Sequence, residues 1–304
     1  MEKIFRALAE KNRLRILLLL EAGPLNVTEI VTILGLSQSN VSHHLKLLLD
    51  AEIVERRGRG NWSFYHASKS NSFVSSVVKS AFEHRELLSG FSEDMRQLAS
   101  CYSERRNAST KFFNSLEEGD WKSISEGLNY ADEYLPFITN KIPDDSTALE
   151  IGCGDGSMLP LLLGKASEVI AVDNSIEMLN RARKLLLNSS DERIFLRLGD
   201  AEHLPLGDGT VDFVLMHMLL HHAGNPSKAV KEAYRVLSDN GVLVLIDLTE
   251  YHDLKYKEIQ GDLWSGFSSE QITKYLIEAG FKVTDKQLFG NSKVLGFVAL
   301  KGNR

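Results

Sequence analysis

A glycine-rich loop follows a strand-like segment in the second half of the chain. The segment at residues 147–151 runs into Gly152-Cys153-Gly154-Asp155-Gly156, and a helical run starts near Met158. Glycines at such a turn let the backbone approach a ligand closely, because no Cβ stands in the way. The spacing is G-x-G-x-G, whereas dinucleotide-binding proteins use G-x-G-x-x-G. Asp155 inside the loop would repel a pyrophosphate but attract a positively charged sulfonium or ammonium group, so a dehydrogenase is disfavoured.

Two further acidic residues follow the next two strand-like segments. Asp173 ends the run at 168–173, and Asp200 follows the run at 194–199. A carboxylate at such a strand end can accept hydrogen bonds from both hydroxyls of a ribose. Asp200 could accept an adenine amino group while the N–H of Ala201 faces a ring nitrogen. Each residue alone is more typical of a turn or a cap, but three cues in chain order favour an adenosyl-binding site.

The elements that must position these residues alternate between strands and helices from residue 147 onward. Strands are predicted near 147–151, 168–173, 194–199, 211–216, 242–248, 282–289 and 294–300. Such alternation predicts an α/β fold with a doubly wound, mostly parallel sheet of seven strands. Ligands of these sheets bind at the carboxyl ends of the strands.

The first 66 residues have the pattern of a helix-turn-helix followed by a β-hairpin. Asn26 and Glu29 resemble a capping box, Gly35 breaks the helix that they start, and Ser37 can cap the next helix. A glycine-containing turn at 58–60 separates two β-rich runs, which is typical of a hairpin. The pattern therefore predicts a winged helix-turn-helix.

The second helix of this motif would present a polar face to the DNA major groove. Its candidate DNA contacts are Ser39, Asn40, Ser42, His43 and Lys46. The hairpin adds three candidate phosphate contacts, Arg56, Arg57 and Arg59. Residues 1–70 carry ten basic and seven acidic side chains, whereas the remainder carries 25 and 34. This asymmetry favours residues 1–70, called the head below, as the part that binds DNA. The alternative is that the head is a helical packing domain with a solvated face.

Several stretches of the head resemble the ArsR family of bacterial repressors. They are Lys11–Leu17, Leu36–Leu48, the wing-like residues 53–60 and Tyr65. The resemblance covers about residues 1–85. It implies a homodimer, joined partly through the helix near 71–89, that binds a palindromic double-stranded DNA operator.

No metal site is expected from the sequence. Many ArsR-family members sense metals through paired cysteines on the first helix of the helix-turn-helix. The matching stretch here, residues 25–31, has no cysteine. His84 is a lone histidine on the predicted dimer helix, and such residues are more often solvated. Arsenic methylation needs several thiolates to hold the ion. With only Cys101 and Cys153, far apart in the sequence, this activity is not expected.

The second part of the chain resembles the class I S-adenosylmethionine-dependent methyltransferases. The pattern continues through Leu204-Pro205-Leu206, Val211-Asp212 and Leu220-His221-His222, and it spans about residues 110–304. The resemblance implies that the loop holds the methionine part of S-adenosylmethionine. The implied cofactor-binding residues are Glu150, Gly152, Gly154, Gly156, Asp173, Asn174, Asp200, Ala201, Met216 and His217.

The whole chain resembles bacterial fusions of an ArsR-type regulator with a methyltransferase. The residues that carry this resemblance are Arg105-Arg106, Phe112-Phe113, Asp247-Leu248, His252 and Trp264-Ser265-Gly266-Phe267. We therefore expect a winged helix DNA-binding domain at 1–70, a helical dimerisation and connector region at 71–145, and a methyltransferase domain at 146–304.

The sequence leaves the catalytic residues open. Methyl transfer from a sulfonium depends mainly on alignment, and a base matters only if the acceptor must lose a proton. The polar candidates near the sheet edge are His217, His221, His222, Asp247 and His252. For His221 and His222, a packing role at a helix start is the favoured alternative.

Two functions follow from these patterns. The first is a methyltransferase that acts on an unidentified small molecule and is fused to a DNA-binding regulator. The second is a repressor that senses S-adenosylmethionine or another metabolite without turnover. The complete set of cofactor cues favours the enzyme.

Composition limits the class of protein further. The chain has 304 residues, of which 43% are hydrophobic and 25% charged, as in a folded protein of two domains. Two cysteines exclude a disulfide framework. No apolar run approaches the roughly 18–20 residues that span a bilayer, and Ile16–Leu20 is too short for a signal peptide core. A cytoplasmic protein is expected.

Overall fold

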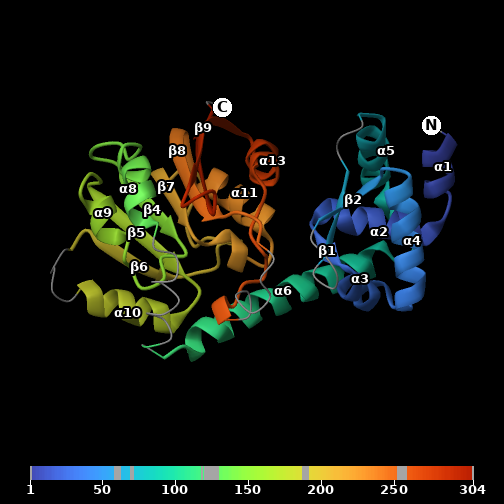
Figure 1. Cartoon of the computed structure of the whole chain (residues 1–304), viewed down its shortest axis with the longest axis horizontal. Coiled ribbons are helices and arrows are strands. Elements are labelled where there is room, and N and C mark those ends of the chain that lie inside the picture. The colour runs from blue at the N-terminus through green and yellow to red at the C-terminus, as the bar shows by residue number, and fades with distance from the viewer. Residues whose placement is uncertain are drawn as a thin grey trace. The chain divides into compact units, whose positions relative to one another are not determined.

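The computed structural model describes residues 2–57, 63–68, 72–117, 119, 130–186, 192–251 and 259–302. Residue contacts separate the chain into two compact units, Met1–Glu104 and Arg105–Arg304. Each unit has its own hydrophobic core. Figure 1 follows the chain by colour, from the blue helices of unit 1 to the red strands of unit 2.

Unit 1 is a helical unit with a small sheet. Its elements are α1 (Glu2–Leu8), α2 (Lys11–Ala22), β1 (Leu25–Asn26), α3 (Val27–Leu34), α4 (Gln38–Asp50), β2 (Val54–Arg57), β3 (Phe64–Ala67), α5 (Ser72–Glu83), the 3₁₀ helix η2 (Arg85–Leu87) and the first part of α6 (Phe91–Ser115). The sheet is antiparallel with the strand order β1-β3-β2, which confirms the predicted hairpin.

Local interactions set the ends of α3 and α4, the two helices of the helix-turn-helix. Oδ1 of Asn26 accepts a hydrogen bond from the N–H of Glu29 at 3.0 Å, and the Glu29 carboxylate accepts one from the N–H of Asn26 at 2.8 Å. This capping box starts α3. Gly35 ends α3 in the left-handed region at φ 64°. Ser37 then caps α4 through a 3.3 Å hydrogen bond from the N–H of Asn40.

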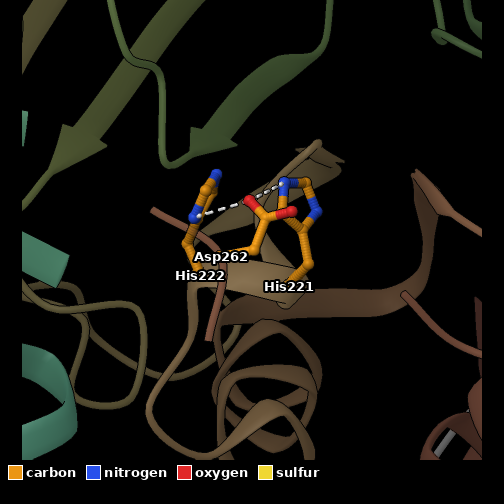
Figure 2. Close-up of side chains that lie close together, drawn as sticks. All are labelled: His221, His222 and Asp262. Atoms are coloured by element: carbon orange, nitrogen blue, oxygen red, sulfur yellow. Dashed lines mark ion pairs between the residues drawn. The ribbon is translucent and has the colours of Figure 1, made fainter. Parts of the chain in front are cut away.

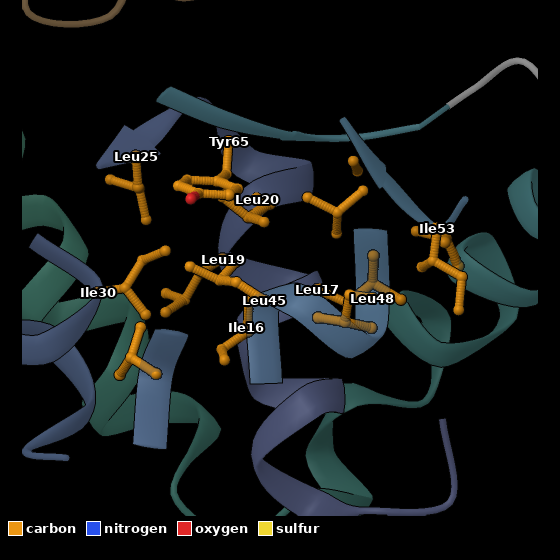
Figure 3. Close-up of a cluster of buried hydrophobic side chains, with 14 of the residues drawn as sticks. Ile16, Leu17, Leu19, Leu20, Leu25, Ile30, Leu45, Leu48, Ile53 and Tyr65 are labelled. Atoms are coloured by element: carbon orange, nitrogen blue, oxygen red, sulfur yellow. The ribbon is translucent and has the colours of Figure 1, made fainter. Parts of the chain in front are cut away.

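The core of unit 1 collects apolar side chains from most of its elements (Figure 3). Leu45 and Leu48 of α4 pack in it with Ile16 of α2, as the helical spacing predicts. Val78 of α5 and Tyr102 of α6 belong to the same cluster.

Residues 71–145, the predicted connector, contribute to both units. In unit 1, the Arg15 guanidinium binds the buried carboxylate of Asp94 through two hydrogen bonds of 2.7 and 2.6 Å, which joins α2 to the start of α6. In unit 2, Tyr134 and Phe137 of α8 pack in the core.

Unit 2 is an α/β unit around one sheet. Its elements are the end of α6, α8 (Ala131–Thr139), β4 (Thr147–Ile151), α9 (Leu159–Leu163), β5 (Glu168–Asp173), α10 (Ile176–Leu186), β6 (Ile194–Leu198), β7 (Val211–His217), η3 (Leu220–His222), α11 (Pro226–Val236), β8 (Leu237–Leu248), α13 (Ser269–Ala279), β9 (Phe281–Phe289) and β10 (Val294–Lys301).

The sheet has seven strands in the order β6-β5-β4-β7-β8-β10-β9. The first five strands pair in parallel, and β10 runs antiparallel to both β8 and β9. This topology confirms the predicted mostly parallel sheet. Its parallel strands end together at one edge, where the loops after β4, β5, β6 and β7 meet.

Apolar strand residues cover both faces of this sheet. Ala148, Phe213 and Val244 belong to a core cluster that also includes residues of α8, α9 and α10. On the alternate positions, Leu149 and Val214 are fully buried as well. Figure 1 shows α11 beside β8 and α9 beside β5, as their contacts require. None of the described helices has the length and apolar character needed to cross a membrane.

Candidate functional site

A cavity of about 370 Å³ lies at the carboxyl ends of the parallel strands of unit 2. Its volume is within the range of small-molecule sites. Eight of the ten residues that the sequence proposed for the cofactor line it. They are Glu150, Gly152, Gly154, Asp173, Asn174, Asp200, Ala201 and His217. The catalytic candidates His221 and His222 line it too.

The glycine-rich loop forms one wall of this cavity. Gly152 and Gly154 have φ of 73° and 52°, in the left-handed region where a side chain is strained. A Cβ on Gly152 would lie 2.6 Å from Cδ1 of Leu219. Gly156 is buried and is not part of the lining, because it packs against Ala182, whose Cβ would be 3.0 Å from an added Cβ. The structure therefore gives Gly156 a packing contact.

Asp173 organises the loops at the end of β5. Its Oδ2 accepts a hydrogen bond from the N–H of Gly154 at 2.9 Å, and its Oδ1 accepts one from the N–H of Ser175 at 2.8 Å. Burial raises the pKa of this carboxyl, while these backbone donors favour its charged form. Asp173 thus holds the glycine-rich loop and faces the cavity at the same time.

Glu150 is the acidic residue of β4, and its side chain is buried, with 1% of the residue exposed. Its Oε2 atom has no hydrogen-bond partner in the part of the chain that the structure describes, although the residue lines the cavity. Burial raises its pKa well above the usual range, and the nearby Asp155 and Asp173 raise it further. An unpartnered buried carboxylate is costly unless a ligand compensates it. The site therefore suits a cationic group of a ligand.

The loop after β6 is held by an arginine from α6. The Arg106 guanidinium lies 3.2 Å from Oδ2 of Asp200 and donates a 2.8 Å hydrogen bond to Glu202. Oε1 of Glu202 accepts a second hydrogen bond, at 2.7 Å, from the N–H of Asn225. Asp200 is therefore ion-paired in this structure, and a ligand that binds it would share it with Arg106.

At the end of β7, His217 and Met218 face the cavity, whereas Met216 is fully buried and does not line it. Nε2 of His217 lies 3.0 Å from the Tyr134 hydroxyl. Burial lowers the pKa of His217 to about 4, so its imidazole is neutral near pH 7. Burial likewise raises the pKa of Tyr134 to about 12. This pair is uncharged at neutral pH.

Two further histidines of the cavity, His221 and His222, follow β7 in η3. Nδ1 of His221 lies 2.7 Å from Oδ1 of Asp247, at the end of β8, and both side chains are buried. Burial alone would lower the pKa of His221, but the carboxylates of Asp247 and Asp262 outweigh it and raise the value to about 9. Burial lowers the pKa of His222 well below its usual range, and the neighbouring His221 adds to this effect. Asp247 thus supports the cavity wall without lining it. His252 lies outside the described residues.

The polar face of α4 is exposed as the sequence predicts. The exposed side chains are Ser39, Asn40, Ser42, His43 and Lys46, together with Arg56 of β2. The side chain of Arg57 and the whole of Arg59 lie outside the described residues. The exposed face is compatible with a contact to DNA.

Comparison with known proteins identifies both units. Residues 10–56 match the family model for bacterial regulatory proteins of the arsR family. Residues 149–245 match the family model for the methyltransferase domain. The chain joins an ArsR-family helix-turn-helix domain to a methyltransferase domain. These matches confirm the resemblance that the sequence motifs carry.

Individual relatives each match part of the chain. An uncharacterised methyltransferase of Schizosaccharomyces pombe is 38% identical over 121 residues, which are 38% of this chain and 46% of that protein. The arsenite methyltransferase of Halobacterium salinarum is 25% identical and covers 61% of this chain and 50% of its own length. The arsenical resistance operon repressor of Bacillus subtilis is 40% identical over 65 residues, 21% of this chain and 62% of that protein. The chain thus spans about half the length of the methyltransferases that it matches.

A solved structure supports the fold of the methyltransferase domain. It is a methyltransferase of Haloferax volcanii in complex with the Trm112 methyltransferase activator, with a TM-score of 0.53 and 17% identity. The alignment covers 62% of this chain and 99% of that chain. At this identity the likeness shows the class I methyltransferase fold alone.

Several residues of the methyltransferase cavity do not stand out in the sequence pattern. Arg106 entered only through the whole-chain resemblance, and Tyr134 and Glu202 were not singled out. Each of them lies far along the chain from its partner in the cavity. The only signal that could have found Glu202 is its place two residues after Asp200, at the end of a strand.

Proposed function

We propose that the chain is an S-adenosylmethionine-dependent methyltransferase that acts on an unidentified small molecule and is fused to an ArsR-type transcriptional regulator. The observation that carries the proposal is the buried Glu150 carboxylate, which lines the cavity and whose Oε2 atom has no hydrogen-bond partner in the described chain. Asp155 lines the same wall. A ligand with an ammonium and a sulfonium group would compensate this negative charge.

The proposal assigns the cofactor to residues of this wall. Glu150 and Asp155 would face its positive groups, and Gly152 and Gly154 would let it approach the backbone. Asp173 and Asn174 would bind the ribose. A second set, Asp200 and Ala201, would bind the adenine, with Arg106 sharing the Asp200 carboxylate. Met216 and Gly156 act through packing in this assignment, and His217 borders the methionine part.

The cofactor would supply an electrophilic methyl group, and the residues of the chain would orient the acceptor and exclude water. If the acceptor must lose a proton, His217 is the candidate that is neutral near pH 7 and therefore able to accept it. Its Nε2 atom lies against the Tyr134 hydroxyl, which fixes the ring. His221 lines the cavity and is held by the buried Asp247 behind it, and we assign this pair a positioning role.

Arsenic is not proposed as the methyl acceptor, although two relatives act on or respond to arsenic compounds by name. Cys153 is buried, and burial raises the pKa of its thiol, so a thiolate is disfavoured. Cys101 belongs to unit 1, whereas Cys153 belongs to unit 2. In the described part of unit 2, Cys153 is the one cysteine, so the several soft donors that an arsenic ion requires are not gathered there.

For the head, we propose binding to a palindromic DNA operator as a homodimer. The exposed residues of α4 would read base edges, and Arg56, Arg57 and Arg59 would contact phosphates. The finer division into residues 1–70, 71–145 and 146–304, with dimerisation through the helix near 71–89, is part of this proposal. A cytoplasmic location follows from a role on bacterial DNA.

Calorimetric titration with S-adenosylmethionine tests the proposal. We expect one site per chain and at least about a tenfold loss of affinity in Glu150→Gln, equivalent to about 1.4 kcal/mol. Glu192→Gln, which changes an exposed carboxylate before β6, is the matched control and should bind as the parent protein does. Folded protein that does not bind the cofactor would contradict the proposal. Binding without turnover of any acceptor would favour the sensing repressor instead.

A further inference from the structure

Three potential metal ligands converge beside the cavity. His221 and His222 of η3 meet Asp262, from the loop before α13, and Figure 2 shows all three side chains pointing toward one another. One donor atom from each residue lies within 4.8 Å of the other two. The imidazoles come from adjacent residues, and their ring centroids are 4.1 Å apart.

The distances within this cluster differ from those of direct hydrogen bonds. Oδ1 of Asp262 lies 3.7 Å from Nε2 of His221 and 3.6 Å from Nδ1 of His222. Both separations exceed the 2.7–3.2 Å that is typical of such hydrogen bonds. Two ligand atoms of a tetrahedral zinc site, each about 2.1 Å from the ion, are about 3.4 Å apart. The two distances from Oδ1 of Asp262 are therefore close to that between donors around one shared ion.

Neighbouring groups hold two of the three donors in place. Asp247 lies 2.7 Å from Nδ1 of His221, which leaves Nε2 directed at Asp262. The Tyr251 hydroxyl donates a hydrogen bond to Oδ2 of Asp262, and Oδ1 is the oxygen that lies near both histidines. A carboxylate behind the histidine and a fixed carboxylate are typical surroundings of metal ligands. Nδ1 of His222 has one weaker contact, 3.4 Å to the carbonyl oxygen of Gly261.

We propose that His221, His222 and Asp262 bind a divalent first-row transition metal ion such as Zn²⁺ or Fe²⁺. Two imidazole nitrogens and one carboxylate oxygen form the donor set of catalytic zinc sites and of mononuclear iron sites. Because His221 and His222 line the cavity, an ion bound by their imidazoles would lie at the cavity wall, where a ligand in the cavity could reach it. An oxygen-bearing ligand would bind the ion there. The site departs from the sequence expectation that the chain binds no metal.

The sequence gives a reason why this site was not expected. His221 and His222 are adjacent, and neighbouring residues of a regular α-helix point in different directions. The short 3₁₀ turn of η3 brings their rings together instead. Asp262 is 40 residues further along the chain, so only the packing of its loop against η3 completes the set.

Titration of the full, untagged chain with Co²⁺ after chelator treatment tests the proposal. Co²⁺ replaces Zn²⁺ in such sites and reports its coordination through visible d–d absorption. We expect one ion per chain and displacement by Zn²⁺. His222→Ala should lower the Co²⁺ affinity by about 100-fold, the upper end of the loss seen when even an outer partner is removed. Asp262→Asn, which keeps the shape of the side chain, should also lower it.

His84→Ala is the matched control. It removes an exposed histidine of unit 1 and should leave the Co²⁺ affinity unchanged. Circular dichroism verifies that each variant is folded, and the His222→Ala result decides the proposal if Asp262→Asn does not fold. Folded parent protein without Co²⁺ absorption, or equal binding by His222→Ala, would overturn the site. S-adenosylmethionine titration of the same preparations is independent, so a failure of the proposed function is distinguishable from a failure of the metal site.

Discussion

Nδ1 of His221 and Oδ1 of Asp247 lie 2.7 Å apart, and the pair joins the turn after β7 to the end of β8. The second oxygen of Asp247 accepts a 2.7 Å hydrogen bond from the N–H of Leu220. Oδ1 also accepts one of 2.8 Å from the N–H of Leu248. One buried carboxylate thus fixes the orientation of a cavity histidine and the path of two loops.

Replacement of Asp247 by alanine should destabilise the methyltransferase domain. The change leaves the His221 ring and two buried N–H groups without their acceptor, at about 1–3 kcal/mol for each group left unsatisfied. We expect a loss of about 3 kcal/mol in the free energy of unfolding, measured by urea denaturation. Asp239→Ala, at an exposed position of β8, is the control and should change it by less than about 0.5 kcal/mol. Equal stability of the two variants would show that the buried pair is not structural.

The stability of the protein should fall in mild acid because of His217. Its pKa is about 4 in the folded chain, below the ordinary value of 6.5. Between these values the unfolded state binds a proton that the native state does not, so the contribution is complete above pH 6.5. It is then lost as the pH falls toward 4, and it amounts to at most about 3 kcal/mol. Unfolding measured from pH 7 to pH 4 should show a shallower decline in His217→Gln than in the parent protein.

Cofactor binding should release a proton from Glu150. Burial, Asp155 and Asp173 raise the pKa of this carboxyl in the free protein. A cationic ligand favours the charged carboxylate, so affinity should increase with pH up to the raised pKa and then level off. Calorimetry in two buffers of different ionisation enthalpy measures the release. In Glu150→Gln the two buffers should give the same heat, and a buffer-dependent heat in that variant would assign the proton to another group.

Asp173→Ala should weaken cofactor binding without unfolding the chain. The carboxylate contacts the N–H groups of Gly154 and Ser175 and faces the cavity, so its loss removes both a ligand contact and an anchor of the loop. We expect at least about a tenfold loss of S-adenosylmethionine affinity. Asp173→Asn separates the two effects, because its amide oxygen can still accept one backbone hydrogen bond. Unchanged affinity in the alanine variant would remove the ribose assignment.

Two variants of the head should change DNA binding in different ways. Arg56→Ala should weaken binding to all sequences and reduce the slope of log affinity against log salt by about 1. Asn40→Ala should cost about 1–3 kcal/mol on the preferred operator and relax its sequence preference. Gel-shift titrations at several salt concentrations distinguish them. If both variants change only the salt slope, α4 is not the helix that reads bases.

Several local features of both units follow from short stretches of sequence. The capping box of Asn26 and Glu29, the left-handed Gly35 and the glycine-rich loop each depend on residues a few positions apart. Spacing along the chain is sufficient to predict such features. Strand-end positions of Asp173 and Asp200 followed from the alternation of apolar runs, because parallel strands carry their ligands at one edge.

The tertiary structure decided which distant side chains meet. Arg106 reaches Asp200 and Glu202 across more than 90 positions of sequence. The Tyr134 hydroxyl meets His217 across 83 positions. Their spacing carries no periodic signal, because these contacts depend on how α6 and α8 pack against the sheet edge.

The sequence by itself determined the two families, the order of the strands along the chain and the glycine-rich loop with its acidic residue. Only the tertiary structure showed that Gly156 and Met216 pack away from the cavity, and that His221, His222 and Asp262 converge beside it. The physical reason is that local hydrogen bonds and hydrophobic periodicity act between near neighbours in the chain. Side-chain direction at a loop is fixed by contacts from segments far away in sequence.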